Sequence, residues 1–180
     1  MKPFLKFRWL HNLWKQFIPG TIRSFAAIDL QLIVYDFDGV MTDNRVLVLQ
    51  DGTEGVFANR SDGLAVQRIK KLGIPQLILS TETNPVVQAR AAKLSLEVIS
   101  GCVDKKTAME QLCRSRGLDL SQVLYVGNDL NDLGIMRVVG YSCAPADAMP
   151  EVRAIARYVF KTKGGAGVLS ELAGRLECRA

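Results

Sequence analysis

Two carboxylates stand directly after a short apolar run, within residues 32–42 of the chain. Asp36 and Asp38 are one residue apart, and Gly39 follows them. On an extended backbone, side chains two residues apart lie on the same side, so these carboxylates would repel each other and attract a cation. Oxygen ligands of this kind suit Mg²⁺, with a substrate phosphate as the usual partner. The pattern also fits a strand that ends in an ordinary polar turn.

Three further groups of polar residues stand where predicted strands end or where the helix between them begins. They are Ser80, Thr81 and Glu82 at the end of the strand at 76–80, Lys105 and Lys106 at the start of the helix at 105–116, and residues 127–132 after the strand at 123–126. Taken singly, the hydroxyl pair fits a helix cap and the lysine pair fits a solvated helix face. If the strands are parallel, their carboxyl ends converge on one crevice. A hydroxyl, an ammonium group, carboxylates and a glycine turn would there form a phosphate-plus-Mg²⁺ site.

Short apolar runs alternate with stretches of helical periodicity along most of the chain. Strands are predicted at 32–35, 76–80, 96–99, 123–126, 141–144 and 158–160, and helices at 64–72, 85–94, 105–116, 130–138, 150–156 and 167–176. A hairpin around the Asp51-Gly52 turn, over 45–58, follows the first strand. This alternation predicts an α/β fold, with a Rossmann-like parallel sheet and helices on both faces.

The composition excludes several classes of function. With 180 residues, 48% of them hydrophobic, the chain can form one domain with a proper core. It has four cysteines without a CxxC pair and one histidine, His11, so a zinc site and a histidine-based catalytic triad are not expected. Reduced thiols in a cytoplasmic protein are the plain interpretation. There is no apolar run of roughly 20 residues that would span a membrane.

Most of the net charge of +5 belongs to the first 30 residues, which hold five basic residues and one acidic residue. Residues 31–180 carry a single excess positive charge, so the charge does not indicate binding to nucleic acid. Aromatic and basic residues recur at helical spacing over 1–18, and Pro19-Gly20 ends the pattern. Such a helix could lie on an anionic membrane surface or a partner, or pack on its own domain or a neighbouring subunit. We therefore predict a basic, aromatic extension over 1–30 and a folded domain over 31–180.

From residue 31 to residue 176 the chain resembles a phosphatase of the haloacid dehalogenase superfamily. Residues 36–42 are similar to the first motif of that family, Ser80 to its hydroxyl motif, Lys105 to its lysine motif and residues 127–132 to its acidic motif. The resemblance implies that Asp36 is a nucleophile that forms an aspartyl-phosphate, and that Asp38 is general acid and then base. It also implies that Asp36 and the Asp38 carbonyl bind Mg²⁺, while Ser80 and Lys105 hold the phosphoryl oxygens.

One position departs from the pattern of the family, which usually has aspartate after the glycine of the acidic motif as the third metal ligand. This chain has Asn128 there. An amide oxygen can bind Mg²⁺, but the site then carries one negative charge fewer. Asp129 would be a substitute ligand, and Asp132 matches the carboxylate that supports the site. We expect metal binding to be retained but weaker, with an inactive domain kept for oligomerisation as the alternative.

Two features of the sequence concern the surroundings of the site: the absence of a cap insertion and a glycine pair late in the chain. Only a hairpin lies between Asp36 and the strand that ends at Ser80, and no insertion separates Ser80 from Lys105, so the chain encodes no cap domain. Because phosphoryl transfer needs water to be excluded, a neighbouring subunit or a large substrate must close the site, and the resemblance implies a homotetramer. The segment 163–165 contains a glycine pair that would let the chain approach the site closely.

The capless branch that the chain resembles includes phosphatases of 3-deoxy-octulosonate 8-phosphate and of nonulosonate 9-phosphates, and carboxy-terminal domains of acylneuraminate cytidylyltransferases. The octulosonate enzymes tend to have a basic residue at the position of Glu82. The nonulosonate type tends to have the acid, with Arg and Lys at the positions of Arg90 and Lys93. The resemblance favours a sugar-acid phosphate of the nonulosonate (sialic-acid) type, with octulosonate 8-phosphate as the alternative. Thr81 and Arg60 complete the expected substrate contacts, although Arg90 and Lys93 also fit an exposed helix face.

Overall fold

The computed structural model describes Phe25 and residues 29–177, so the helix expected over 1–18 lies outside the described part of the chain. Six strands form one parallel sheet in the order β5-β4-β1-β6-β7-β8. They are β1 (Leu32–Tyr35), β4 (Gln76–Leu79), β5 (Glu97–Ile99), β6 (Val123–Val126), β7 (Tyr141–Ala144) and β8 (Tyr158–Val159). The predicted α/β fold with a parallel sheet is therefore confirmed.

The register of the central strands decides which residues leave the sheet together. Tyr35, the last residue of β1, pairs with Ile78 on one side and with Val126 on the other. The chain segments that begin at Asp36, Ser80 and Gly127 therefore leave the same edge of the sheet, as the sequence predicts.

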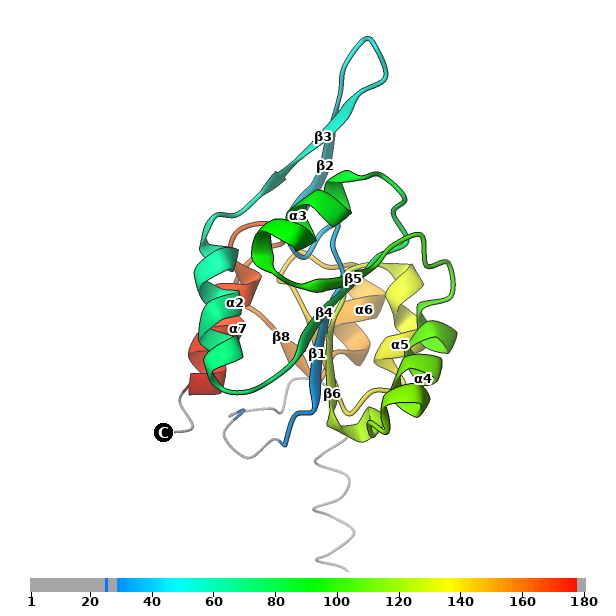
Figure 1. The fold of residues 1–180 in the computed structure, drawn as a ribbon, viewed down its shortest axis with the longest axis vertical. Coiled ribbons are helices and arrows are strands. Elements are labelled where there is room, and N and C mark those ends of the chain that lie inside the picture. Colours follow the sequence, from blue (N-terminus) through cyan, green and yellow to red (C-terminus); the bar gives the residue numbers. More distant parts are fainter. Residues whose placement is uncertain (1–24, 26–28, 178–180) are drawn as a thin grey trace, which may run out of the picture.

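Helices cover both faces of the sheet (Figure 1). The helices are α2 (Ser61–Lys71), α3 (Val86–Leu94) and α7 (Val168–Glu177) on one face, and α4 (Lys105–Arg116), α5 (Leu133–Met136) and α6 (Pro150–Ile155) on the other. Ile33 and Tyr35 pack in the first layer, whereas Leu32 and Val34 pack in the second. This alternation explains why all four residues of β1 are apolar or aromatic: both faces of the strand are buried. Within the described residues, no helix is long and apolar enough to cross a membrane.

The hairpin of β2 (Thr42–Val48) and β3 (Glu54–Ala58) projects beyond the body of the protein (Figure 1). Its first strand begins three residues earlier than the sequence predicts, so the hairpin starts within the loop that follows Asp36. Only this hairpin and α2 lie between β1 and β4 in the described chain, and no cap domain is inserted there.

Two helices differ from the prediction by more than one residue at an end. The single helix expected at 130–138 is a 3₁₀ turn (Leu130–Asp132) followed by the short α5. The reason is a reciprocal cap, in which the Asp129 side chain accepts from the backbone of the turn and the Asp132 side chain accepts from the Asp129 N–H. Helix α2 begins at Ser61 rather than at residue 64.

Candidate active site

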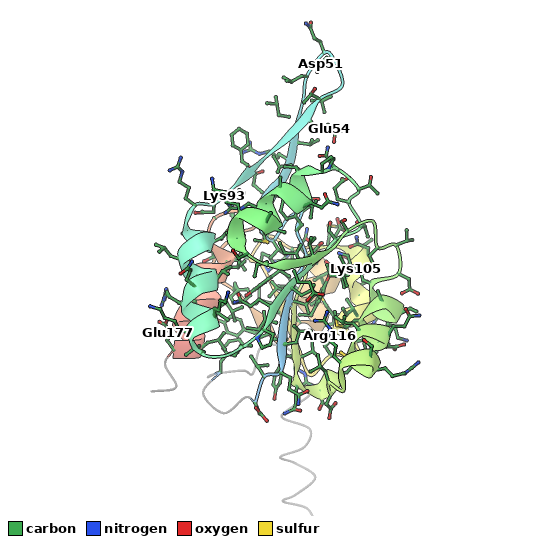
Figure 2. All side chains as sticks on the ribbon, in the orientation of Figure 1. Asp51, Glu54, Lys93, Lys105, Arg116 and Glu177 are labelled. Atoms are coloured by element: carbon green, nitrogen blue, oxygen red, sulfur yellow. The ribbon has the colours of Figure 1, made fainter. Side chains whose placement is uncertain are left out.

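Lys105 is buried between two carboxylates at the carboxyl edge of the sheet. Figure 2 labels the position of Lys105 in the fold. Its Nζ lies 2.8 Å from Asp36 Oδ1 and 2.7 Å from Asp132 Oδ1. Asp36 comes from the end of β1, Asp132 from the turn after β6 and Lys105 from the first residue of α4. One buried ammonium group thus links three segments that are far apart in the sequence.

The charges of this cluster shift the pKa values of its members. Burial by itself would lower the pKa of Lys105, but Asp36 and Asp132 outweigh burial and hold that pKa above its ordinary value, so the ammonium stays charged. Burial and then the neighbouring Asp132 raise the pKa of Asp36, although Lys105 and the Phe37 N–H oppose the rise. Two buried carboxylates facing one ammonium leave a surplus negative charge that a further cation would stabilise.

Asp132 supports the site, because both its carboxylate oxygens accept hydrogen bonds from other parts of the protein. The Tyr125 hydroxyl donates to Oδ1 at 2.6 Å, beside the Lys105 contact. The backbone N–H groups of Asn128 and Asp129 donate to Oδ2 at 2.8 and 3.1 Å. Asp132 therefore fixes the course of the acidic loop rather than facing the point where a metal would bind.

Three oxygen-bearing groups converge at one point: the Asp36 side chain, the Asp38 carbonyl and the Asn128 side-chain amide. One terminal atom of the Asn128 amide lies 2.8 Å from the Asp38 carbonyl oxygen and 3.1 Å from Asp36 Oδ2. With the amide nitrogen turned inward, Asn128 donates to both oxygens; with Oδ1 turned inward, three oxygens face one another with no proton between them. The second arrangement is the kind of donor set that Mg²⁺ prefers, so these residues fit the ion.

The two oxygens of Asp36 have different surroundings. Oδ1 accepts from the Phe37 N–H at 2.8 Å and contacts Lys105, whereas Oδ2 faces Asn128. Gly39 makes the approach of Asn128 possible: its φ is +78°, and a Cβ there would lie 2.0 Å from Asn128 Nδ2. Among the described residues, no group of three or more His, Cys, Asp or Glu side chains is placed to hold a metal. The oxygen set instead combines one carboxylate, one backbone carbonyl and one amide.

Asp38 is one of the residues that line a cavity of about 280 Å³. Burial raises the pKa of Asp38, with the Thr42 hydrogen bond opposing the rise and Glu82 adding to it. The Thr42 hydroxyl donates to Asp38 Oδ1 at 3.2 Å. A carboxyl group with a raised pKa in the wall of a cavity is suited to donate a proton to a leaving group.

The cavity lies between the hairpin and the start of α3. Its lining consists of Asp38, Asn44, Arg45, Val46, Glu54, Gly55, Val56, Glu82, Asn84 and Val86. Asn84 Nδ2 donates to Glu54 Oε2 at 3.2 Å, which ties the hairpin to the loop after β4. Glu82 Oε1 accepts from the Thr83 and Asn84 N–H groups at 2.7 and 2.8 Å, and these bonds fix its side chain at the wall.

Ser80 and Thr81 lie where the sequence predicts, at the end of β4. Ser80 is buried and its Oγ accepts from the Glu82 N–H at 3.1 Å. Thr81 Oγ1 accepts from Asn131 Nδ2 at 3.4 Å, so the loops after β4 and β6 meet. Asp129 also lies in this region, but its Oδ1 accepts from the Leu130 N–H at 2.6 Å.

The three basic residues predicted to bind substrate lie outside the cavity lining. Arg90 Nη2 donates to the Asn59 carbonyl at 2.6 Å and lies 3.6 Å from Asp62 Oδ2, with only 15% of the side chain exposed. Burial raises the pKa of Asp62 to about 6, although Arg90 opposes the rise. Lys93 lies on the outer part of α3, well apart from Lys105 (Figure 2), and Arg60 is exposed beside α2. Their role in substrate binding stays a prediction.

Sequence reasoning did not identify several residues of this site. Tyr125 lies within the strand predicted at 123–126, and nothing in its sequence context marks the hydroxyl that donates to Asp132. Arg45 and Glu54 of the hairpin line the same cavity as Asp38, which the spacing alone does not reveal. Thr42 belongs to the first motif, and its position four residues after Asp38 was the one available signal.

Residues 67–172 match the haloacid dehalogenase-like hydrolase family. The chain belongs to this family, and with the site described above it is a phosphatase; the described residues include no cap domain.

Relatives of the chain include phosphatases of 3-deoxy-D-manno-octulosonate 8-phosphate, both among curated proteins and among solved structures. The chain is 32% identical over 147 residues to the 3-deoxy-D-manno-octulosonate 8-phosphate phosphatase of Yersinia pestis, covering 81% of this chain and 79% of that protein. A chain from Streptomyces avermitilis that is described as an HAD family hydrolase is 44% identical, with a TM-score of 0.81, over 85% of this chain and 90% of that one. The corresponding phosphatase of Moraxella catarrhalis, solved with magnesium ion, phosphate ion and KDO, is 29% identical, with a TM-score of 0.80, over 86% and 91%.

The buried position of Lys105 leads to a stability prediction. Lys105→Met should lower the free energy of unfolding by about 3–5 kcal/mol in metal-free buffer, because it leaves two buried carboxylates without their partner. Lys106→Met is the matched control: this side chain is 47% exposed and lies 3.7 Å from Glu110 one helical turn away, so its loss should change stability by less than about 0.5 kcal/mol. Urea unfolding followed by circular dichroism measures both, and equal effects would contradict the assignment.

Proposed function

We propose that the protein is a Mg²⁺-dependent phosphate monoesterase that hydrolyses a sugar-acid phosphate. The observation that carries the proposal is the convergence of Asp36 Oδ2, the Asp38 carbonyl and the Asn128 amide, directly beside the Lys105–Asp36 ion pair. Asp36, the Asp38 carbonyl and Asn128 would hold Mg²⁺, which supplies positive charge to neutralise the phosphoryl oxygens. The magnesium and phosphate ions in the Moraxella catarrhalis relative support this interpretation.

Asp36 is the proposed nucleophile. Its Oδ1 attacks phosphorus, the bond from phosphorus to the sugar oxygen breaks, and Asp38 gives that oxygen a proton. The product on the protein is an aspartyl-phosphate. Water then attacks the phosphorus while Asp38 accepts its proton, which releases inorganic phosphate and restores the Asp36 carboxylate. Lys105 and Ser80 would hold the phosphoryl oxygens during both steps.

We further propose a nonulosonate 9-phosphate as the preferred substrate. The support is the position of Glu82, which lines the cavity next to Asp38 where a leaving sugar would lie. A carboxylate there can accept hydrogen bonds from sugar hydroxyl or amide groups. Octulosonate 8-phosphate is the second candidate, because the Yersinia pestis relative named above is a phosphatase of that compound.

Phosphate release from a panel of sugar phosphates tests the activity. We expect Mg²⁺-dependent release from sugar-acid phosphates by the full chain, abolished by EDTA and by Asp36→Asn. Asp119→Asn is the matched control, because Asp119 is exposed and its Oδ1 accepts from the Ser121 N–H at the opposite edge of the sheet. No release from any member of the panel, or release that Asp36→Asn leaves intact, would show that the domain is not this enzyme and would favour a role in oligomerisation.

A substitution at Glu82 distinguishes between the two candidate substrates. With a nonulosonate 9-phosphate as the natural substrate, Glu82→Lys should lower kcat/KM for it by about tenfold or more, because the sugar loses a hydrogen-bond acceptor and meets an ammonium group that cannot accept a hydrogen bond. The same change should leave or raise kcat/KM for octulosonate 8-phosphate. Higher wild-type kcat/KM for octulosonate 8-phosphate would identify that compound as the substrate instead.

We also propose that a homotetramer closes the site. The hairpin carries a run of exposed aliphatic side chains, with Val46, Leu47 and Val48 each about half exposed and Phe57 at 66%. An isolated two-stranded hairpin with exposed apolar residues is marginally stable, so a second copy of the chain that packs on it would stabilise it and cover the cavity. Light scattering should give about four times the chain mass of 19.8 kDa. Phe57→Asp should lower that mass, and a monomeric wild type would contradict the proposal.

A further inference from the structure

A turn near the carboxyl end of the sheet, residues 163–166, lies against the loop that follows Asp38. The Gly165 N–H donates to the Val40 carbonyl at 3.1 Å. Gly164 is packed so closely that a Cβ there would lie 2.1 Å from the Gly39 carbonyl oxygen and 3.1 Å from that of Thr42. No side chain fits between the two segments, so the turn and the loop are in direct backbone contact.

Two side chains form hydrogen bonds with the backbone of this turn at its glycine pair. Asn59 Nδ2 donates to the Gly165 carbonyl at 3.1 Å, while Asn59 Oδ1 accepts from the Ser61 N–H at 3.0 Å at the start of α2. On the other side, Asp147 Oδ1 accepts from the Gly164 N–H at 2.9 Å. The turn is therefore held between the start of α2 and the loop after β7.

The loop that carries Asp147 also reaches the acidic loop of the site. Two residues after Asp147, the Met149 N–H donates to the carbonyl oxygen of Asn128 at 2.9 Å. In addition, the Ala146 N–H donates to the Thr162 carbonyl at 3.0 Å. Residues 146–149 therefore connect both sides of the oxygen set: Asn128 directly, and the loop after Asp38 through Gly164.

We propose that residues 163–166, the glycine brace, hold the Asp38 carbonyl in register with Asn128, and that Asn59 and Asp147 are positioning residues for this oxygen set. The inference rests on the proposed Mg²⁺ site. A backbone carbonyl cannot change its direction by a side-chain rotation, so its position depends on the loop that carries it. Mg²⁺ demands near-ideal octahedral geometry, and a displaced loop weakens its binding.

A brace that only filled space would behave differently. Its disruption would lower the stability of the whole fold, but it would not single out residues 39–43 or the affinity for Mg²⁺. Two measurements on the full chain separate these roles. Hydrogen–deuterium exchange of the metal-free protein reports on the loop itself, and isothermal titration with MgCl₂ reports on the ion without any substrate.

The variants are Asp147→Ala, Asp147→Asn and Asn59→Asp. Asp147→Asn keeps an oxygen that can accept from Gly164, so it is the conservative rescue. Asn59→Asp keeps the acceptor for Ser61 but replaces the donor to Gly165 with an oxygen. Asp119→Ala is the matched control, because it also removes an exposed aspartate that accepts a backbone N–H, at 2.8 Å, far from the brace.

We expect Asp147→Ala and Asn59→Asp to speed exchange in residues 39–43 and to weaken Mg²⁺ binding about three- to tenfold, as the loss of one hydrogen bond would. Asp147→Asn and Asp119→Ala should match the wild type. Wild-type exchange and Mg²⁺ affinity in Asp147→Ala, or equal changes in Asp119→Ala, would overturn the brace. A wild type that binds no Mg²⁺ would contradict the proposed function instead, while exchange at 39–43 would still decide whether the brace holds the loop.

Discussion

The structure depends on one buried ammonium group held between two buried carboxylates. Burial of ions costs several kcal/mol each, so a cluster of this kind persists only where hydrogen bonds compensate the loss of water. Lys105 meets Asp36 and Asp132, and Asp132 in turn accepts from Tyr125 and from two backbone N–H groups. With both carboxylates ionised, the cluster carries one surplus negative charge. A surplus of this kind attracts a cation, and the cation would in turn attract a phosphate, which is the electrostatic basis of the proposed site.

The substitution of asparagine at position 128 fits this electrostatic arrangement. An aspartate there would place a further carboxylate next to Asp36, whose pKa is already raised by burial and by Asp132. The amide keeps an oxygen at the same point without adding charge, and in the absence of an ion it can turn its nitrogen toward the Asp38 carbonyl and Asp36 Oδ2. We expect this exchange to lower repulsion in the metal-free protein and to lower the attraction for Mg²⁺ at the same time.

Much of the fold and the centre of the site could be predicted from the sequence, because strand ends in a parallel sheet share one edge. That rule alone places Asp36, Ser80 and Asn128 together. The rule says nothing about Tyr125, a residue inside β6 whose hydroxyl donates to Asp132. It also says nothing about the Asp38 carbonyl or the Asp147–Gly164 contact, since backbone groups have no sequence signature. The helix pattern of Arg90 fits a solvated face equally well, and only the structure shows its contacts with Asn59 and Asp62.

A crystal structure of the full chain grown in saturating MgCl₂ tests the account most directly. We expect one ion about 2.0–2.1 Å from Asp36 Oδ2, the Asp38 carbonyl oxygen and Asn128 Oδ1, with water at the other positions. Asp132 should keep its bonds to Lys105 and Tyr125. An ion held by the side chains of Asp129 and Asp132, or no ion beside Asp36 at saturation, would contradict the assignment of this oxygen set.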